Sequence, residues 1–298
     1  MVAPLVSVCI PTYNYRRYLP QALESALAQT ARDIEVVVVD NCSEDGSAEV
    51  IEAYARRDAR IAAHRNERNL GMTANFNRGL ALARGKYVKL LCADDVLEPE
   101  CAERLVAALE AEPRAGLAGC ARRYFRDDGT TVRIRAYAAR ATLVPGERAV
   151  RECFFKGNLI GEPTAVLFRR SDAGGGFDEA YRQAFDMALW LRLLEGRDFA
   201  FLEAPLCGIR EHGASGTGAN LEAGRVTEDK LRLFERYAPR VQGSPLERLR
   251  WDARMASSVA REAAKHAPRR DVSKAVYYPG LFRAATLPLV RALTALRG

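Results

Sequence analysis

Four consecutive valines at positions 36–39 stand between Glu35 and Asp40. A strand of this composition presents apolar side chains on both sides, because successive side chains point to opposite faces of a sheet. Strands buried on both faces are typical of parallel sheets, since crossover helices cover each side of such a sheet. The valine run therefore predicts a buried strand within an α/β sheet.

Short β-rich segments and amphipathic segments alternate around this strand. We predict strands at residues 5–10, 35–39, 61–64 and 87–91, and helices at residues 18–30, 48–57 and 73–83. This order predicts an α/β fold with a mostly parallel central sheet and helices on both faces. Ligands bind such sheets beyond the carboxyl ends of the strands. Asn14, Asp40 and Asp94 lie at or just past predicted strand ends, so we expect the site there.

The pattern is less regular beyond residue 98. Residues 122–148 are polar and weakly patterned, which predicts a loop or flap over the site. Residues 161–170 include a further predicted strand, and residues 185–194 have the pattern of a strongly amphipathic helix. After residue 222 the pattern is helical to the end, interrupted by prolines.

Composition narrows the class of protein. Hydrophobic residues make up 48% of the chain and charged residues 28%, the balance of a soluble globular protein rather than a disordered or fibrous one. The seven cysteines are scattered and form no C-x-x-C pair, which favours free thiols in a reducing compartment. No apolar run approaches the roughly 20 residues of a membrane helix, and residues 5–10 are too short for a signal sequence. We expect a cytoplasmic protein.

The net charge of +7 is concentrated in residues 245–298, which contain eleven Lys or Arg and four Asp or Glu. A basic segment suggests contact with an anionic surface, such as a membrane or a nucleic acid. A solvated helical face is the alternative. The segment has no aromatic residues spaced for base stacking, so we expect no nucleic-acid partner.

Two acidic features point to chemistry. Asp94 and Asp95 directly follow a predicted buried strand, where a metal ion would stabilise adjacent carboxylates that otherwise repel each other. The alternative is the capped start of a following helix. Asp186 begins an apolar helix, and partial burial would suit its carboxylate as a base. A first-turn acid favoured by the helix dipole is the alternative there.

Arg210 and His212 alternate after a predicted strand, so on an extended chain they point the same way. Together they are suited to hold a phosphate and a metal, although loop histidines are often only solvated. The following Gly-rich stretch lacks a lysine at P-loop spacing, and no G-x-G-x-x-G follows the first strand. These absences argue against an NTPase or a dinucleotide-binding enzyme.

In combination and in order, these features resemble a family 2 glycosyltransferase. The likeness covers about residues 5 to 217. The segments that carry it are Ser7-Val-Cys-Ile-Pro-Thr-Tyr-Asn14, residues 18–25, Glu35-Val-Val-Val-Val-Asp-Asn-Cys-Ser-Glu-Asp-Gly-Ser47, Asn69-Leu-Gly71, Asn75-Phe-Asn-Arg-Gly79, residues 83–87, Asp94-Asp95, Gly176-Phe-Asp178, residues 186–192 and Arg210-x-His212.

The resemblance implies a GT-A fold and a set of site residues. It implies a nucleotide site that holds the base, ribose and diphosphate of a nucleoside diphosphate sugar, made of Pro11, Thr12, Tyr13, Asn14, Asp40, Asn69, Asn75 and Arg210. It places the divalent metal, Mg²⁺ or Mn²⁺, on Asp94 and His212, and puts Ala93 and Asp95 beside the sugar or behind the metal. The first Asp of the family's D-x-D motif is Cys92 here. The catalytic base is Asp186, and the family's preceding Glu is Phe185 here.

The activity implied is inverting transfer of a sugar to a hydroxyl of a saccharide or lipid-linked acceptor, as in polysaccharide synthesis, with UDP- or dTDP-linked donors favoured. Asp186 would take the hydroxyl proton in a single displacement, while the metal and Arg210 stabilise the leaving diphosphate. A catalytically inactive sugar-nucleotide-binding partner subunit is the alternative, because Cys92 and Phe185 replace family acids.

The resemblance also divides the chain. Residues 1–220 form the expected catalytic domain, with a nucleotide-binding half at about 1–97 and an acceptor-binding half at about 98–220. Residues 221–298 form a basic helical region. Its last part, 276–298, is either an amphipathic helix lying on the inner face of a membrane or a helical lid packed on the catalytic domain.

Overall fold

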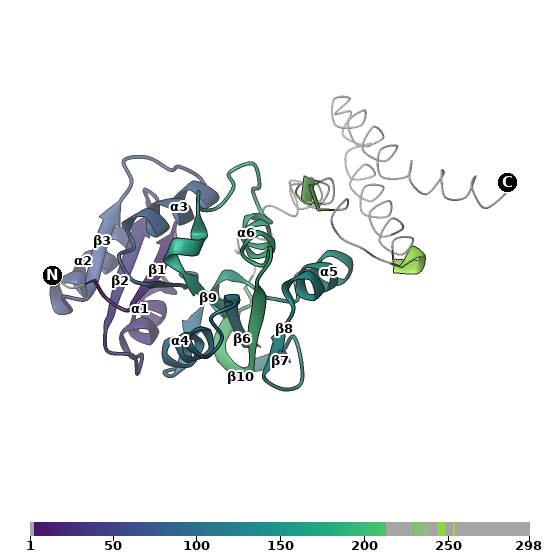
Figure 1. Cartoon of the computed structure of the whole chain (residues 1–298). Coiled ribbons are helices and arrows are strands. Elements are labelled where there is room, and N and C mark those ends of the chain that lie inside the picture. The colour runs from purple at the N-terminus through teal and green to yellow at the C-terminus, as the bar shows by residue number, and fades with distance from the viewer. Residues whose placement is uncertain are drawn as a thin grey trace, which may run out of the picture.

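The computed structural model describes residues 3–212 and, beyond them, residues 229, 232–233, 236–237, 244–247 and 253. The first half alternates strands and helices as the sequence predicts (Figure 1). Its elements are β1 (Val6–Thr12), α1 (Leu19–Leu27), β2 (Ile34–Asp40), α2 (Ser47–Arg57), β3 (Ile61–Arg65), α3 (Met72–Leu82), β4 (Tyr87–Leu90) and β5 (Val96–Leu97).

The second half is a mixture of helices and longer strands. Its elements are α4 (Cys101–Ala111), β6 (Ala115–Phe125), β7 (Thr131–Arg135), β8 (Thr142–Val144), α5 (Gly146–Lys156), the 3₁₀ turn η1 (Pro163–Ala165), β9 (Val166–Arg169), the 3₁₀ turn η2 (Arg170–Ala173), α6 (Phe185–Leu193) and β10 (Asp198–Arg210).

One sheet runs through both halves in the order β3-β2-β1-β4-β9-β6-β10-β5. Strands β3, β2, β1 and β4 are parallel, and all seven residues of β2 are buried, as the valine run predicts. Beyond β4 the sheet is mixed: β9 is antiparallel to β4 and β6, whereas β6 and β10 are parallel. The parallel half places the carboxyl ends of β1 and β2 at one edge, above which ligands bind in such sheets.

Residues 122–148 are not the continuous loop that their pattern predicts, although the turn between β6 and β7 lies against the end of β10, where Asp127 pairs with Arg210. Residues 122–125 continue β6, whose eleven residues are buried except for Arg123. They are followed by β7, β8 and the start of α5. Arg122 lies in this strand with 2% of its surface exposed, because its guanidinium pairs with Glu162. Long-range ion pairing therefore buries a polar sequence that has no local signature of a strand.

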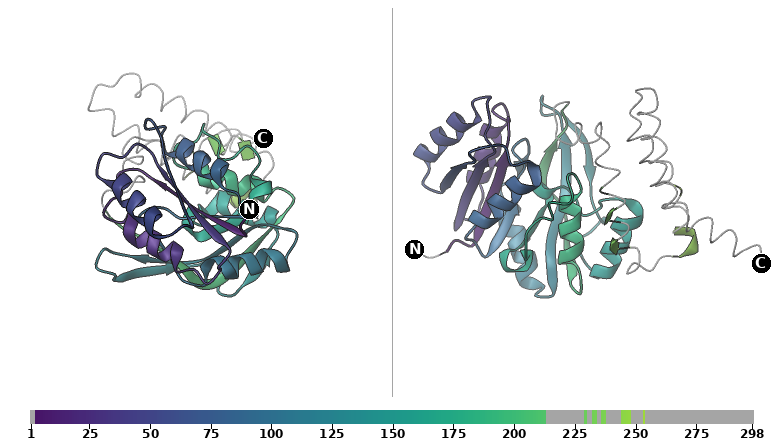
Figure 2. Two further views of the ribbon diagram at one scale, coloured as in Figure 1. Left: turned by 90° about the vertical axis from the view of Figure 1, so that its left-hand side faces the viewer. Right: turned by 90° about the horizontal axis from the view of Figure 1, so that it is seen from above.

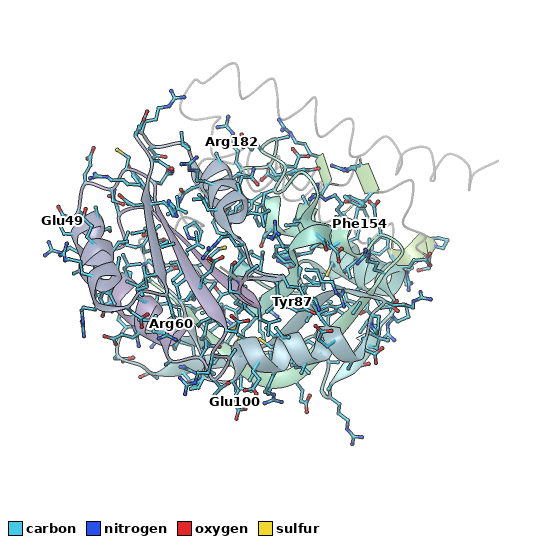
Figure 3. The ribbon with its side chains drawn as sticks, turned by 60° about the vertical axis from the view of Figure 1, so that its left-hand side comes forward. Glu49, Arg60, Tyr87, Glu100, Phe154 and Arg182 are labelled. Carbon is cyan, nitrogen blue, oxygen red and sulfur yellow. The ribbon has the colours of Figure 1, made fainter. Side chains whose placement is uncertain are left out.

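Helices cover both faces of the sheet (Figures 1 and 2). One apolar cluster joins the sheet to α3, α5 and α6, and the other joins it to α1, α2 and α4. The side chains fill the space between these layers, with Tyr87 near the middle of the sheet and Glu49 and Phe154 toward its two ends (Figure 3). The helix at α6 is confirmed, but it is not amphipathic: six of its nine residues are buried, including Trp190.

Described residues of the C-terminal region contact this core. Leu233 and Tyr237 are 3% and 2% exposed and belong to the same apolar cluster as α6. The amphipathic segment predicted at 276–298 lies outside the described residues. Among the helices that the structure does describe, none combines the length and the apolar character needed to cross a membrane.

Candidate active site

The loops after β1 and β2 hold each other at the carboxyl edge of the sheet. The backbone N–H of Asn14 donates to Ser43 Oγ, and the N–H of Glu44 donates to Asn14 Oδ1, both over 2.9 Å. Asn14 and Cys42 have φ angles of +58° and +62°, which non-glycine residues rarely adopt. Strained residues of this kind persist where the surroundings over-determine them, often at ligand sites.

Asp40 is the last residue of β2 and is 1% exposed. Its carboxylate accepts hydrogen bonds from the N–H of Ser43 and pairs with Arg65 Nε at 3.2 Å. On the neighbouring strand, Pro11 and Thr12 are buried, and Thr12 Oγ1 has no hydrogen-bond partner among the described residues. Tyr13 follows with 41% of its surface exposed. The structure thus combines a buried carboxylate with an exposed aromatic ring.

Asparagines form a network beneath this edge. Asn75 donates from Nδ2 to the carbonyls of Val39 and Thr12, and its Oδ1 accepts from Asn66. Asn69 Oδ1 accepts from Asn41 Nδ2 at 2.8 Å. Asn75 is 3% exposed and both amide atoms are used within the protein, so its role here is to join the ends of β1 and β2. The predicted contact of Asn75 with the nucleotide stays a prediction.

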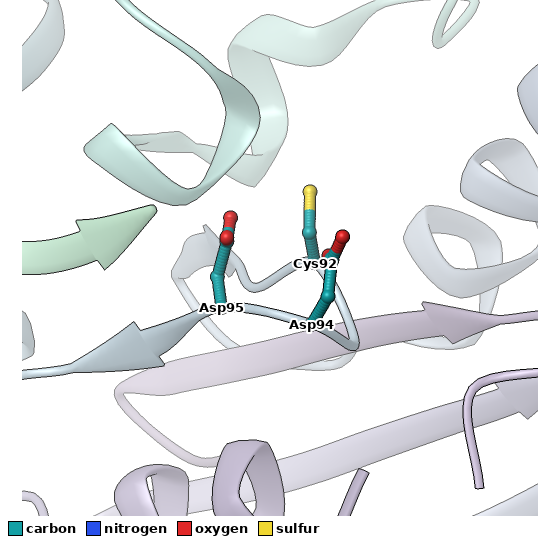
Figure 4. Close-up of side chains that lie close together, drawn as sticks. All are labelled: Cys92, Asp94 and Asp95. Atoms are coloured by element: carbon teal, nitrogen blue, oxygen red, sulfur yellow. The ribbon is translucent and has the colours of Figure 1, made fainter. Parts of the chain in front are cut away.

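Asp94 and Asp95 follow β4, and Cys92 stands beside them (Figure 4). One ligand atom from each of the three lies within 4.8 Å of the others. Both oxygens of Asp95 are engaged, since Oδ2 accepts from Thr164 Oγ1 at 2.6 Å and Oδ1 accepts from the N–H of Arg210 at 2.9 Å. Burial, and then the charge of Asp94, raise the pKa of Asp95 well above its ordinary value. Asp95 therefore holds this loop against β10.

The predicted alternation of Arg210 and His212 is confirmed, because both reach Asp94. His212 Nε2 lies 2.9 Å from Asp94 Oδ2, and Arg210 Nε donates to the Asp94 carbonyl at 2.8 Å. The remaining guanidinium nitrogens of Arg210 donate to Asp127 and Gln21. Arg210 therefore braces the Asp94 loop, and these three side-chain bonds leave one N–H on each of Nη1 and Nη2. The predicted contact of Arg210 with a diphosphate stays a prediction.

The residues at Asp94 fit a divalent cation. The Asp94 carboxylate is partly exposed and its partner His212 is almost buried. His212 Nε2, the ring nitrogen that faces Asp94, is the one that could share an ion with the Asp94 carboxylate. An oxygen donor and an imidazole suit Mn²⁺, and carboxylate oxygen suits Mg²⁺. Cys92 and Asp95 also place a ligand atom close to Asp94.

Asp186 lies in the first turn of α6 and is half-buried. Its Oδ1 accepts from the N–H of Met187 at 2.7 Å, and Oδ2 lies 3.5 Å from Asn158 Nδ2. Burial raises the pKa of Asp186 to about 7, and the negative charge of Glu162 adds to the rise. A carboxyl group with this pKa is matched to proton transfer near neutral pH. Asp186 is also the acid in the first turn of α6, as the helix-dipole alternative predicts, so the two interpretations do not exclude each other.

Glu162 is a site residue that sequence analysis missed. It precedes η1, where Arg122 Nε donates to its Oε2 at 2.7 Å and Tyr124 Oη donates to its Oε1 at 2.5 Å. Its charge reaches both Asp186 and Asp95, whose pKa values it raises. The only sequence signal was an acidic residue in the Gly161-Glu-Pro163 turn before a predicted strand. Nothing local indicates that this turn folds back over the site.

The same α/β architecture occurs in solved GT-A glycosyltransferases. The structure of Staphylococcus aureus TarS 1-349 in complex with UDP-GlcNAc matches with a TM-score of 0.60 and 17% identity, over 95% of this chain and 92% of that one. The mannosyltransferase PcManGT of Pyrobaculum calidifontis, in complex with GDP-Man and Mn²⁺, matches with a TM-score of 0.60 and 19% identity, over 96% and 87%. The fold of this chain is the GT-A fold.

Sequence comparison assigns the family. Residues 7–176 match the model of glycosyl transferase family 2, so the chain belongs to that family and is a nucleotide-sugar glycosyltransferase. A relative in Mycobacterium tuberculosis, the uncharacterized protein MT1568, is 34% identical over 78% of this chain and 75% of its own length. The uncharacterized glycosyltransferase MJ1057 of Methanocaldococcus jannaschii is 30% identical over 67% and 68%. The predicted family is confirmed.

Proposed function

We propose that this enzyme transfers a sugar, with inversion, from a nucleoside diphosphate donor to a hydroxyl of a saccharide or lipid-linked acceptor, in the synthesis of a polysaccharide or other glycoconjugate. The observation that carries the proposal is the carboxyl group of Asp186, whose pKa is raised to about 7 by burial. An acceptor hydroxyl is a poor nucleophile at neutral pH and needs a base as it attacks.

Asp186 is the base in this mechanism. Its carboxylate takes the proton of the acceptor hydroxyl while the hydroxyl oxygen forms a bond to the anomeric carbon and the bond to the diphosphate breaks. General base catalysis of this kind contributes about 10² to 10⁴ in rate. One displacement with attack opposite the leaving group inverts the anomeric centre. No second carboxylate nucleophile is needed, in contrast to a retaining mechanism.

Residues at the ends of β1 and β2 hold the nucleotide. Asp40 and the loop of Pro11, Thr12, Tyr13 and Asn14 contact base and ribose, and Asn69 shapes the adjoining loop. Asp94 and His212 hold Mg²⁺ or Mn²⁺, while Ala93 and Asp95 lie beside the sugar or behind the ion. A divalent cation bound there offsets the negative charge that develops on the leaving diphosphate. UDP- and dTDP-linked sugars are the favoured donors.

The proposal divides the chain as the resemblance implies. About residues 1–97 bind the nucleotide, about residues 98–220 bind the acceptor, and residues 221–298 form a basic region that contacts the inner face of a membrane when the acceptor is lipid-linked. Cysteine usage favours a cytoplasmic location.

An inactive partner subunit is the second candidate. The observation that favours it is Cys92, which stands where the family has an acid. Against it, Asp94 and His212 remain paired at 2.9 Å, and Asp186 keeps a pKa suited to proton transfer.

Thermal unfolding with UDP, dTDP, GDP and CMP, each with and without Mn²⁺, tests the proposal. A ligand at about 100 times its Kd stabilises the folded state by roughly 2.7 kcal/mol, which raises the unfolding midpoint by several degrees. We expect one nucleotide to give a shift that Mn²⁺ enlarges, followed by release of that nucleotide from its sugar donor. Binding without any turnover would support the inactive partner, and no shift with any nucleotide would contradict both candidates.

Turnover is expected to rise with pH through about 7, because Asp186 accepts a proton only when it is ionised and its pKa is about 7. Glu162→Gln is expected to move this midpoint to lower pH, since the charge of Glu162 raises that pKa. The measurement is kcat from pH 5 to 9 at saturating donor and Mn²⁺. Glu110→Gln, on the exposed side of α4, is the control that leaves the midpoint in place. If the pH midpoint of kcat in Glu162→Gln is unchanged or higher, the assignment of Asp186 as the base is contradicted.

A further inference from the structure

Asp229 is buried against the turn that precedes α6, although it lies more than forty residues further along the chain. Its Oδ2 accepts hydrogen bonds from three consecutive backbone N–H groups, those of Arg182 at 2.9 Å, Gln183 at 2.6 Å and Ala184 at 2.9 Å. The residue is 2% exposed. Arg182 marks the start of this turn at the surface in Figure 3.

The bonds to Asp229 fix the turn that leads into α6. The helix begins at Phe185, so the N–H groups of Arg182, Gln183 and Ala184 lie in the three residues just before it. A buried carboxylate that accepts several N–H groups makes strong, charge-assisted hydrogen bonds. The turn before α6 is therefore held by a side chain of the C-terminal region.

Further contacts join the same region to the same loop. Arg232 Nη1 donates to the Ala180 carbonyl at 2.5 Å, and Arg236 pairs with Asp178 at 3.4 Å. Leu233 and Tyr237 are buried in the cluster that contains Phe185. Counted from Asp229, the residues that make these contacts follow at three, four, seven and eight positions along the chain. Side chains at such intervals share one face of a helix. The contacts thus converge on residues 178–185.

We propose that Asp229 is a positioning residue for the base: by fixing the turn at residues 182–184 it sets the place of Asp186, two residues further on. The C-terminal region is then a part of the active site. The inference rests on the proposed role of Asp186 as base. A displacement of about 1 Å at a reacting group can lower the rate about 10²-fold, so a shift of this turn is expected to lower turnover.

Three variants test the inference at pH 8.5, where Asp186 is ionised. Asp229→Ala removes the acceptor, Asp229→Asn keeps an amide oxygen in the same place, and Glu247→Gln is the matched control. Glu247 also joins the C-terminal region to the domain, through Arg151 on α5, but it does not contact the turn. The readout is release of nucleoside diphosphate from UDP-GlcNAc or GDP-mannose, whichever is turned over faster, with kcat and donor KM determined separately.

We expect kcat to fall about 10²-fold in Asp229→Ala and about 10-fold in Asp229→Asn, with donor KM within twofold of the parent enzyme. For Glu247→Gln we expect both kcat and donor KM to stay within twofold of the parent enzyme. Amide hydrogen exchange of the peptide covering residues 185–193 accelerates in Asp229→Ala and not in the control, and this readout decides the matter where turnover is too slow to measure. Unchanged kcat and unchanged exchange would overturn the inference. An equal fall of kcat in Glu247→Gln would also overturn the inference. It would mean that any loss of contact between the C-terminal region and the domain lowers turnover, not the loss of the Asp229 bonds in particular.

Asp186→Asn, alone and combined with Asp229→Ala, separates this inference from the function on which it rests. If Asp229 acts through Asp186, the double variant has the residual rate of Asp186→Asn within twofold. A further fall in the double variant would assign Asp229 a general structural role. Full activity of Asp186→Asn would instead refute Asp186 as the base, whatever the Asp229 variants show.

Discussion

Asp186→Asn is expected to lower turnover by at least 10²-fold while nucleotide binding stays within twofold of the parent enzyme. The amide has nearly the shape of the carboxyl group but cannot take the proton of an acceptor hydroxyl. The measurement is kcat with the donor identified by thermal unfolding, together with the midpoint shift caused by its nucleotide. A variant that retains more than about a tenth of the turnover would refute the assignment.

The same substitution is expected to stabilise the folded protein at pH 8. The pKa of Asp186 rises from an ordinary 3.8 to about 7 on folding. Ionised Asp186 therefore lowers the free energy of unfolding. The loss begins above pH 3.8, grows until about pH 7 and is constant at higher pH, where it is at most about 4 kcal/mol. Asp186→Asn removes it, so the unfolding midpoint rises at pH 8 and hardly changes at pH 4. Asp172→Asn, whose carboxylate pairs with Arg197, is the control that gives no such gain.

Asp94→Asn is expected to abolish the part of the nucleotide's stabilising effect that depends on Mn²⁺, and to lower turnover by at least 10²-fold. Metal assistance is worth several kcal/mol of transition-state stabilisation, and Asp94 with His212 is the pair suited to hold the ion. Thermal unfolding with nucleotide across a Mn²⁺ titration measures the first effect. Undiminished Mn²⁺ dependence in Asp94→Asn would refute the site.

Asp95→Asn is the informative comparison for this result. Both oxygens of Asp95 bond to Thr164 and Arg210 within the protein. Its substitution is therefore expected to leave the response to Mn²⁺ in place. Equal loss of metal dependence in the two variants would mean that Asp95 also binds the ion.

Much of the nucleotide-binding half could be predicted because its signals are local. Hydrophobic runs and helical periodicity lie within single segments, and they located β1 to β4 and α1 to α3 to within a few residues. Asp40 and Asp94 were found because parallel strands bring their carboxyl ends to one edge. The two-residue period of an extended chain predicted that Arg210 and His212 point the same way, and both contact Asp94.

The second half of the chain could not be predicted as well, because its structure depends on contacts between distant segments. Arg122 is polar in sequence, yet it lies inside β6 because Glu162, forty residues later, neutralises it. The partners of Arg210 could not be predicted either, because Gln21 and Asp127 come from two other parts of the chain.

The sequence by itself determined the family and the βαβ order of the first half, and it singled out Asp40, Asp94 and Asp186, because each of these depends on residue types and short spacings. Only the tertiary structure decided what those residues contact: that both oxygens of Asp95 accept hydrogen bonds from Thr164 and Arg210, that the charge of Glu162 raises the pKa of Asp186, and that Asp229 holds the turn before α6. The physical reason is that burial and hydrogen bonding set the pKa and the available donors of a group, and both arise from neighbours that folding brings together from far along the chain.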